Sequence, residues 1–153
     1  MSTRLRDRAR PLVLLLPVAL AALVALSAAA PAAQAAEGCS GPGPKRDTPH
    51  PGGAVSTRIC HAYQTGDVKD LKTGTRAGVL DAGDSWFVCQ RRFRGIDNDP
   101  VAGAENDWWL FTLADRGKSK TTRGWGWFPA NLISGGDDFK PVPGLRTCST
   151  KGL

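Results

Sequence analysis

The sequence predicts an all-β protein, a small β-barrel or sandwich, and three observations carry this prediction. Short segments rich in aromatic and β-branched residues recur between residues 54 and 134, and such residues favour strands. Clusters of Gly, Pro, Asn and Asp separate these segments at short intervals. The uninterrupted segments are also too short for a helix of more than two turns.

The first 35 residues are expected to be a signal peptide that is removed on export. Four arginines precede an apolar stretch, rich in Leu, Val and Ala, over residues 12–30. Ala33-Gln34-Ala35 then places small residues at the positions that a signal peptidase reads. We therefore expect cleavage after Ala35.

Two other interpretations of this segment stay open. An apolar stretch of near spanning length can anchor a protein in a membrane, although Pro17 and Pro31 interrupt this one. A lipid anchor at Cys39 is the second, but Glu37 stands where a lipoprotein site requires an aliphatic residue. The expected product is a secreted monomer, extracellular or associated with the cell wall, without a stable membrane anchor.

The charge of the exported chain argues against nucleic acid as a partner. Removing residues 1–35 leaves 16 of the 20 basic and 13 of the 14 acidic residues, a net charge of +3. A nucleic-acid-binding domain is usually more basic than this. The basic run at residues 90–94 and the basic residues of 118–123 are expected to form a solvated face, or to attract anionic wall polymers loosely.

Proline and glycine mark an extension at each end of the expected domain. Residues 36–53 contain Gly-Pro-Gly-Pro and cannot sustain a helix or a central strand, so they are expected to be a linker. Residues 135–153 are a similar Pro-rich tail. The folded domain is therefore expected over residues 54–134.

Each element of this domain follows from its local pattern. The alternation of Val55, Thr57 and Ile59 predicts a first strand over residues 54–63. Residues 85–93 are rich in aromatic and β-branched residues and predict the strongest strand. The same reasoning predicts a long polar loop at 64–78 that is a candidate functional loop, a turn at 81–84, a second loop at 94–105, a strand at 107–113, a polar hairpin connection at 116–123, a strand at 124–128, and a last short strand at 132–134.

All four cysteines follow the expected cleavage site, and an even number in an exported protein predicts two disulfides. Three pairings are open. We favour Cys39–Cys60, which ties the linker to the first strand, and Cys89–Cys148, which folds the tail onto the strongest strand. No two cysteines are close in sequence, and no histidine forms a ligand motif with them, so no metal site is expected.

Two aromatic segments carry a resemblance to a known family. The first is Asp107-Trp108-Trp109-Leu110, and the second runs from Gly126 to Ile133 with the sequence Gly-Trp-Phe-Pro-Ala-Asn-Leu-Ile. With the acidic turn at residues 81–84, their order resembles Src-homology-3 (SH3) domains over about 80 residues, most closely the SH3-like domains of secreted bacterial proteins. The resemblance implies an SH3-like barrel of about five strands with Pro/Gly-rich N- and C-terminal extensions.

The resemblance also implies a ligand groove and its residues. In the eukaryotic branch, the first Trp of the pair and the Pro of the closing motif line a groove for polyproline ligands, which maps onto Trp108 and Pro129. The closing tyrosine of that branch is replaced here by Leu132. In the bacterial branch such domains often bind peptidoglycan peptides or act as targeting modules, which fits export better.

The expected ligand site combines this resemblance with strand geometry. Successive side chains of a strand point to opposite faces, so Trp108 and Trp109 separate, and Trp125 and Trp127 share a face. Trp109 and Phe128 are expected in the core, and Trp125 is not assigned. Trp108, Trp127 and Pro129 are expected to line one partly exposed groove, flanked by Asp81 and Asp84, where acidic side chains would meet an amine of the ligand.

The sequence predicts a binding protein and no enzyme. His50 and His61 stand in different segments, without the neighbouring nucleophile that a catalytic triad needs. No cofactor is expected. The expected function is a secreted non-catalytic module that recognises a peptide or cell-wall component, such as peptidoglycan, through a Trp-lined groove. The alternative is a small secreted inhibitor or effector that docks on a secreted protein through the same aromatic face.

Overall fold

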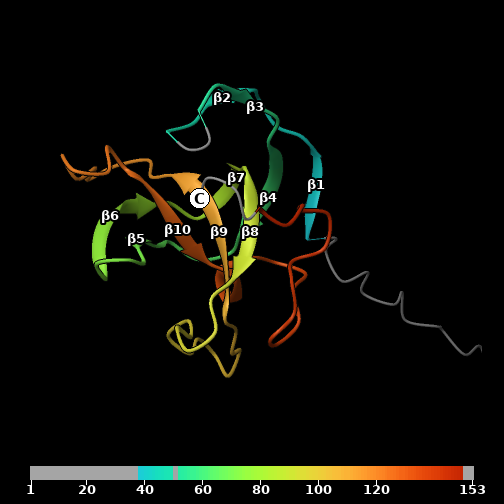
Figure 1. Cartoon of the computed structure of the whole chain (residues 1–153). Helices are drawn as coiled ribbons and strands as arrows, with labels where there is room; N and C mark the ends of the chain where they lie inside the picture. The colour runs from blue at the N-terminus through green and yellow to red at the C-terminus, as the bar shows by residue number, and fades with distance from the viewer. Residues whose placement is uncertain (1–37, 50–51, 150–153) are drawn as a thin grey trace, which may run out of the picture. The chain divides into compact units, whose positions relative to one another are not determined.

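The computed structural model describes residues 38–49 and 52–149, and this part of the chain is all-β, as predicted (Figure 1). Its one helical element is a single 3-10 turn. In chain order the elements are β1 (Cys39–Pro42), β2 (Arg46–Asp47), β3 (Ala54–Val55), β4 (Arg58–Ala62), β5 (Gly66–Asp70), β6 (Thr75–Leu80), β7 (Gly83–Phe87), β8 (Cys89–Arg92), β9 (Trp108–Leu113), β10 (Trp125–Pro129) and the 3-10 turn η1 (Ala130–Leu132).

The strands form three antiparallel sheets rather than the single five-stranded barrel that was expected. The largest sheet has the order β6-β5-β10-β9-β8, a second has the order β1-β4-β7, and β2 pairs with β3. Figure 1 shows β10, β9 and β8 side by side. The predicted polar hairpin connection at 116–123 is confirmed, because it joins the antiparallel β9 and β10.

The main core lies on one face of the five-stranded sheet, which we call the inner face. Alternation sends Leu110 of β9 and Phe128 of β10 into this core, where both are fully buried. The three-stranded sheet contributes Cys60 and Ala62 to the same cluster. Burial of this apolar surface is the main stabilising contribution to the fold.

The segment predicted as one strong strand at residues 85–93 is two strands in two sheets. β7 pairs with β4, whereas β8 pairs with β9. Val88 lies between them, is buried, and its N–H donates to the carbonyl oxygen of Phe111. The main chain therefore passes directly from the three-stranded sheet to the five-stranded sheet at Val88.

The prediction of a polar loop at residues 64–78 is wrong, because this segment holds β5 and most of β6. The first half of the segment reads as polar because β5 buries only one face: Val68 is fully buried, while Asp67 is exposed. Asp67 pairs with Arg76 across the two strands at 2.9 Å. The loop at 94–105 is confirmed as irregular apart from one isolated bridge, Val101 to Ala104.

The extensions are also more ordered than the expected linker and disulfide-tethered tail. β1 is an edge strand on β4, and β2 pairs with β3. In the tail, Val142 and Leu145 are buried in the main core. The last strand expected at 132–134 is absent from the described residues; η1 stands there, followed by a bridge between Ile133 and Ala62.

A buried glutamine ties the tail to the sheet. Gln90, only 1% exposed, donates from Nε2 to the carbonyls of Val142 and Leu145, at 2.8 and 2.6 Å. Its Oε1 accepts from the Val142 N–H at 2.7 Å. One side chain thus satisfies three backbone groups that would otherwise be buried without partners.

Both predicted disulfides are confirmed. Cys39–Cys60 joins directly opposed positions of β1 and β4. Cys89–Cys148 fixes the tail beside β8, and the Cys148 N–H donates to the Gln90 carbonyl. Disulfides of this kind are typical of extracellular proteins. The predicted signal peptide at 1–35 lies outside the described residues, in which no helix has the length and apolar character needed to cross a bilayer.

Replacing Gln90 with Leu should destabilise the protein by about 3 kcal/mol or more, because two carbonyls and one N–H lose their partner inside the fold. Urea unfolding with both disulfides intact measures this. Gln64, which is exposed, supplies the control: Gln64→Leu should change the free energy of unfolding by less than about 0.5 kcal/mol. Equal stability of the two variants would contradict the anchoring role of Gln90.

Removal of Cys89–Cys148 should cost more than removal of Cys39–Cys60. The sequence separations are 59 and 21 residues, and loop closure then gives about 4 and about 3 kcal/mol. The loss of the longer loop also releases the tail from β8. Denaturant unfolding of the two double Cys→Ala variants measures both losses of stability. A larger loss on removal of Cys39–Cys60 would contradict this prediction.

Candidate functional site

The outer face of the five-stranded sheet carries a second aromatic cluster. Alternation directs Phe111 of β9 and Trp127 of β10 to this face, at opposed positions of the ladder. Trp109 lies on the same face and is 1% exposed. Trp125 and Phe93 pack against this cluster and stay partly exposed.

The rings form a continuous row across the strands. Centroid separations are 4.8 Å from Phe93 to Trp127, 5.1 Å from Trp127 to Phe111, and 5.4 Å from Phe111 to Trp125. Trp86 of β7 continues the row at 5.7 Å from Trp125. Neighbouring rings at these distances attract one another beyond their area burial, so the row is rigid.

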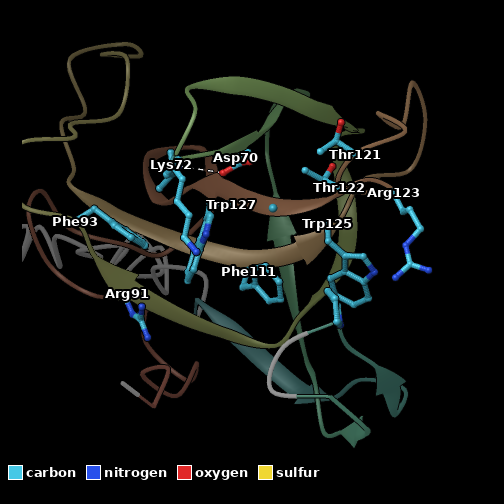
Figure 2. Close-up of a pocket in the computed structure, with 13 residues that line it drawn as sticks. Asp70, Lys72, Arg91, Phe93, Phe111, Thr121, Thr122, Arg123, Trp125 and Trp127 are labelled. Atoms are coloured by element: carbon cyan, nitrogen blue, oxygen red, sulfur yellow. Dashed lines mark hydrogen bonds between the residues drawn. The ribbon is translucent and has the colours of Figure 1, made fainter. Parts of the chain in front are cut away.

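A groove of about 600 Å³ lies over this row (Figure 2). Phe93, Phe111, Trp125 and Trp127 line it with their rings, and Leu71 adds an aliphatic side chain. The volume falls within the range of about 300–1,000 Å³ that is typical of ligand sites. Of the lining rings, those of Phe93 and Trp125 are partly exposed, whereas those of Phe111 and Trp127 are buried beneath them.

Charged side chains border the groove. Lys72, Arg91 and Arg123 line it together with one carboxylate, that of Asp70. The Asp70 carboxylate accepts from the Lys72 backbone N–H at 3.0 Å, drawn as a dashed line in Figure 2. The Arg91 guanidinium lies 5.9 Å from the ring centroids of both Phe93 and Trp127, and it donates to the Ser149 carbonyl at 2.7 Å.

Local backbone features hold the groove residues in place. Arg123 has φ 53° and Gly124 has φ 88°, so the hairpin turns sharply just before Trp125. A Cβ at Gly126 would lie 2.6 Å from the Lys69 carbonyl oxygen, so glycine lets β10 approach β5. The same close approach places Lys69 over the Trp109 ring, 5.8 Å from its centroid, which covers that ring.

The sequence predicted that Trp108, Trp127 and Pro129 line one partly exposed surface. The structure does not bring these three residues together in this way. Trp108 points to the inner face and packs against the main core, whereas Trp127 belongs to the outer cluster. Trp127 is 9% exposed and Pro129 is buried. The predicted separation of Trp108 from Trp109 is confirmed. Trp109 and Phe128 are both buried, as predicted, but on opposite faces: Phe128 belongs to the main core and Trp109 to the outer cluster.

The predicted acidic flank also lies away from the groove. Asp81 pairs with Arg116 at 2.9 Å, and this hydrogen bond raises the pKa of the Arg116 guanidinium. Asp84 pairs with His61 at 2.7 Å, and both side chains are exposed. Of the acidic residues of this region, Asp70 is the one that lines the groove.

Of the residues that line the groove, the predicted ligand site includes Trp127 alone; it misses the rings of Phe93, Phe111 and Trp125 and the cations Lys72, Arg91 and Arg123. The shared parity of Trp125 and Trp127 did indicate one common face, which the structure confirms. Parity alone does not say which face a second sheet covers. Had Leu110 been assigned to the main core together with Phe128, alternation would have placed Phe111 and Trp127 on the opposite face of β9 and β10.

The described residues contain no group of three or more His, Cys, Asp or Glu side chains able to hold a metal ion. The groove instead offers aromatic surface, cationic groups and the hydroxyls of Thr121 and Thr122. Comparison of the chain with protein-family models, with curated proteins and with solved structures gives no significant match.

Replacing Trp108 with Ala should destabilise the protein by about 2 kcal/mol, because a half-buried ring leaves the main core. It should not disturb the groove, which lies on the other face of the sheet. Urea unfolding measures the first effect, and the indole N–H signals of Trp125 and Trp127 in NMR spectra measure the second. Large shifts of those two signals would show that Trp108 and the groove are connected.

Proposed function

We propose that this chain is an extracellular, non-catalytic binding module and that the groove over the aromatic row holds its ligand. The observation that carries the proposal is the groove over the row of rings from Phe93 to Trp125, bordered by charged side chains. The two disulfides support an extracellular location. The ligand is a peptide or a cell-wall component.

We also infer kinship with the SH3-like domains of secreted bacterial proteins. The described order of elements supports it: an acidic turn, the strands β7 and β8, a long loop, the Trp-Trp strand β9, a hairpin and the closing β10. The three-stranded and five-stranded sheets, which share one core, take the place of a closed barrel. The ligand surface in this proposal differs from the groove that the resemblance implies, because Trp108 and Pro129 are packed inside.

A second candidate function uses the same surface. The row of rings is long enough to act as an anchor for a protein partner, as aromatic residues do at interfaces. The chain would then be a small secreted inhibitor or effector. Retention on purified cell wall supports wall binding, whereas specific capture of one protein from culture supernatant supports this alternative.

Replacing Trp125 with Ala should reduce retention on purified peptidoglycan by roughly tenfold or more, since aromatic anchors carry much of the energy of binding. Trp125 is partly exposed, so the fold should persist, and near-ultraviolet circular dichroism checks this. Phe139 is 45% exposed and does not line the groove, so Phe139→Ala is the matched control. Equal retention of both variants would contradict the proposed site.

A further inference from the structure

We propose that the groove selects an acidic peptide segment, with an apolar side chain on the aromatic row and carboxylates at its two ends. This inference rests on the proposed function and names the chemistry of the ligand. Its basis is the charge of the lining, the orientation of the rings, and the state of the sheet edges.

The charge of the groove is positive at both ends. Lys72 and Arg123 lie on opposite sides of Phe111 in Figure 2, and within the described residues neither side chain forms an ion pair. Arg91 adds a third cation against the single carboxylate of Asp70. Beyond the groove, the Arg46 guanidinium lies 4.9 Å from the centroid of the Trp86 ring. Complementarity therefore requires a ligand with negative charge.

Hydrogen-bond donors dominate the groove as well. A Lys ammonium and an Arg guanidinium donate and do not accept. The indole N–H groups of Trp125 and Trp127 have no acceptor among the described residues. A ligand rich in acceptors, such as carboxylates and peptide carbonyls, matches this set.

The rings form a faceted surface and no flat platform. Successive interplanar angles are 75° for Phe93 and Trp127, 52° for Trp127 and Phe111, and 61° for Trp125 and Trp86. Phe111 and Trp125 are stacked at 24°, so each covers one face of the other. Sugar rings and nucleobases stack on open, flat ring faces. Turned rings instead form an uneven pocket that suits an aliphatic or aromatic side chain of a peptide.

The peptide must be recognised through side chains, because both edges of the five-stranded sheet are occupied. On the β8 edge, Gln90 exchanges backbone hydrogen bonds with Arg146 and Cys148 of the tail. On the β6 edge, Val79 donates to the Arg116 carbonyl and Ser119 donates to the Ala77 carbonyl. Addition of the ligand as a further strand is thus blocked, and the outer face is the surface that remains.

The test uses three fluorescein-labelled octapeptides with a central Leu-Pro-Leu flanked by glutamate, glutamine or lysine, and an oligogalacturonate of the same charge as the first. Fluorescence anisotropy with the oxidised protein should show binding of the glutamate peptide, weaker binding of the glutamine peptide, and a loss of affinity in high salt. Lys72→Glu and Arg123→Glu should each lower the affinity of the protein for the glutamate peptide by about fivefold. Lys120→Glu is the control, since Lys120 is exposed and outside the groove lining.

Equal binding of the three peptides, no binding of the glutamate peptide, or equal effects of Lys72→Glu and Lys120→Glu would overturn the inference. Tighter binding of the oligogalacturonate, lost in the same variants, would also overturn it and assign the groove to an anionic glycan. If the peptides fail but Trp125→Ala still abolishes wall retention, the proposed function stands and the acidic-peptide inference alone falls.

Discussion

The alternation of side chains along β9 and β10 is the constraint on which the rest of the structure depends. These two strands are paired in the five-stranded sheet, with Phe111 opposite Trp127 and Leu110 opposite Phe128. The Leu110–Phe128 pair faces the main core, and the Phe111–Trp127 pair faces outward. A slip of one residue would exchange the two sets, bury the aromatic row and expose the core. The fold and the candidate site are therefore fixed by the same register.

The two faces are covered in different ways, and this difference produces the groove. The inner face receives the three-stranded sheet and the tail, with Val142 and Leu145 in the core. The outer face is covered mostly by its own rings, together with Val55 of β3 and Cys148 of the tail. Arg46 lies over the Trp86 ring and Lys69 over the Trp109 ring, whereas the groove lies over the rings of Phe93, Phe111, Trp125 and Trp127.

Parts of this arrangement follow from the sequence and parts do not. Export and the even number of cysteines indicated two disulfides, and strand parity separated Trp108 from Trp109. The β5–β6 pair escaped prediction because Val68 is the one apolar residue of β5. The site was placed on the wrong face because the resemblance selects Trp108, and no local pattern shows that the tail and the three-stranded sheet pack on its side. That choice is made by tertiary contacts, which Gln90 and Cys148 fix from a distance in sequence.

The most direct measurement is an NMR titration with solubilised peptidoglycan fragments that follows the indole N–H signals of the five tryptophans. The signals of Trp125 and Trp127 should shift, because their rings line the groove, and the signal of Trp108 on the inner face should not. Shifts confined to Trp108, or the absence of any shift, would contradict the claim that the outer aromatic face binds the ligand.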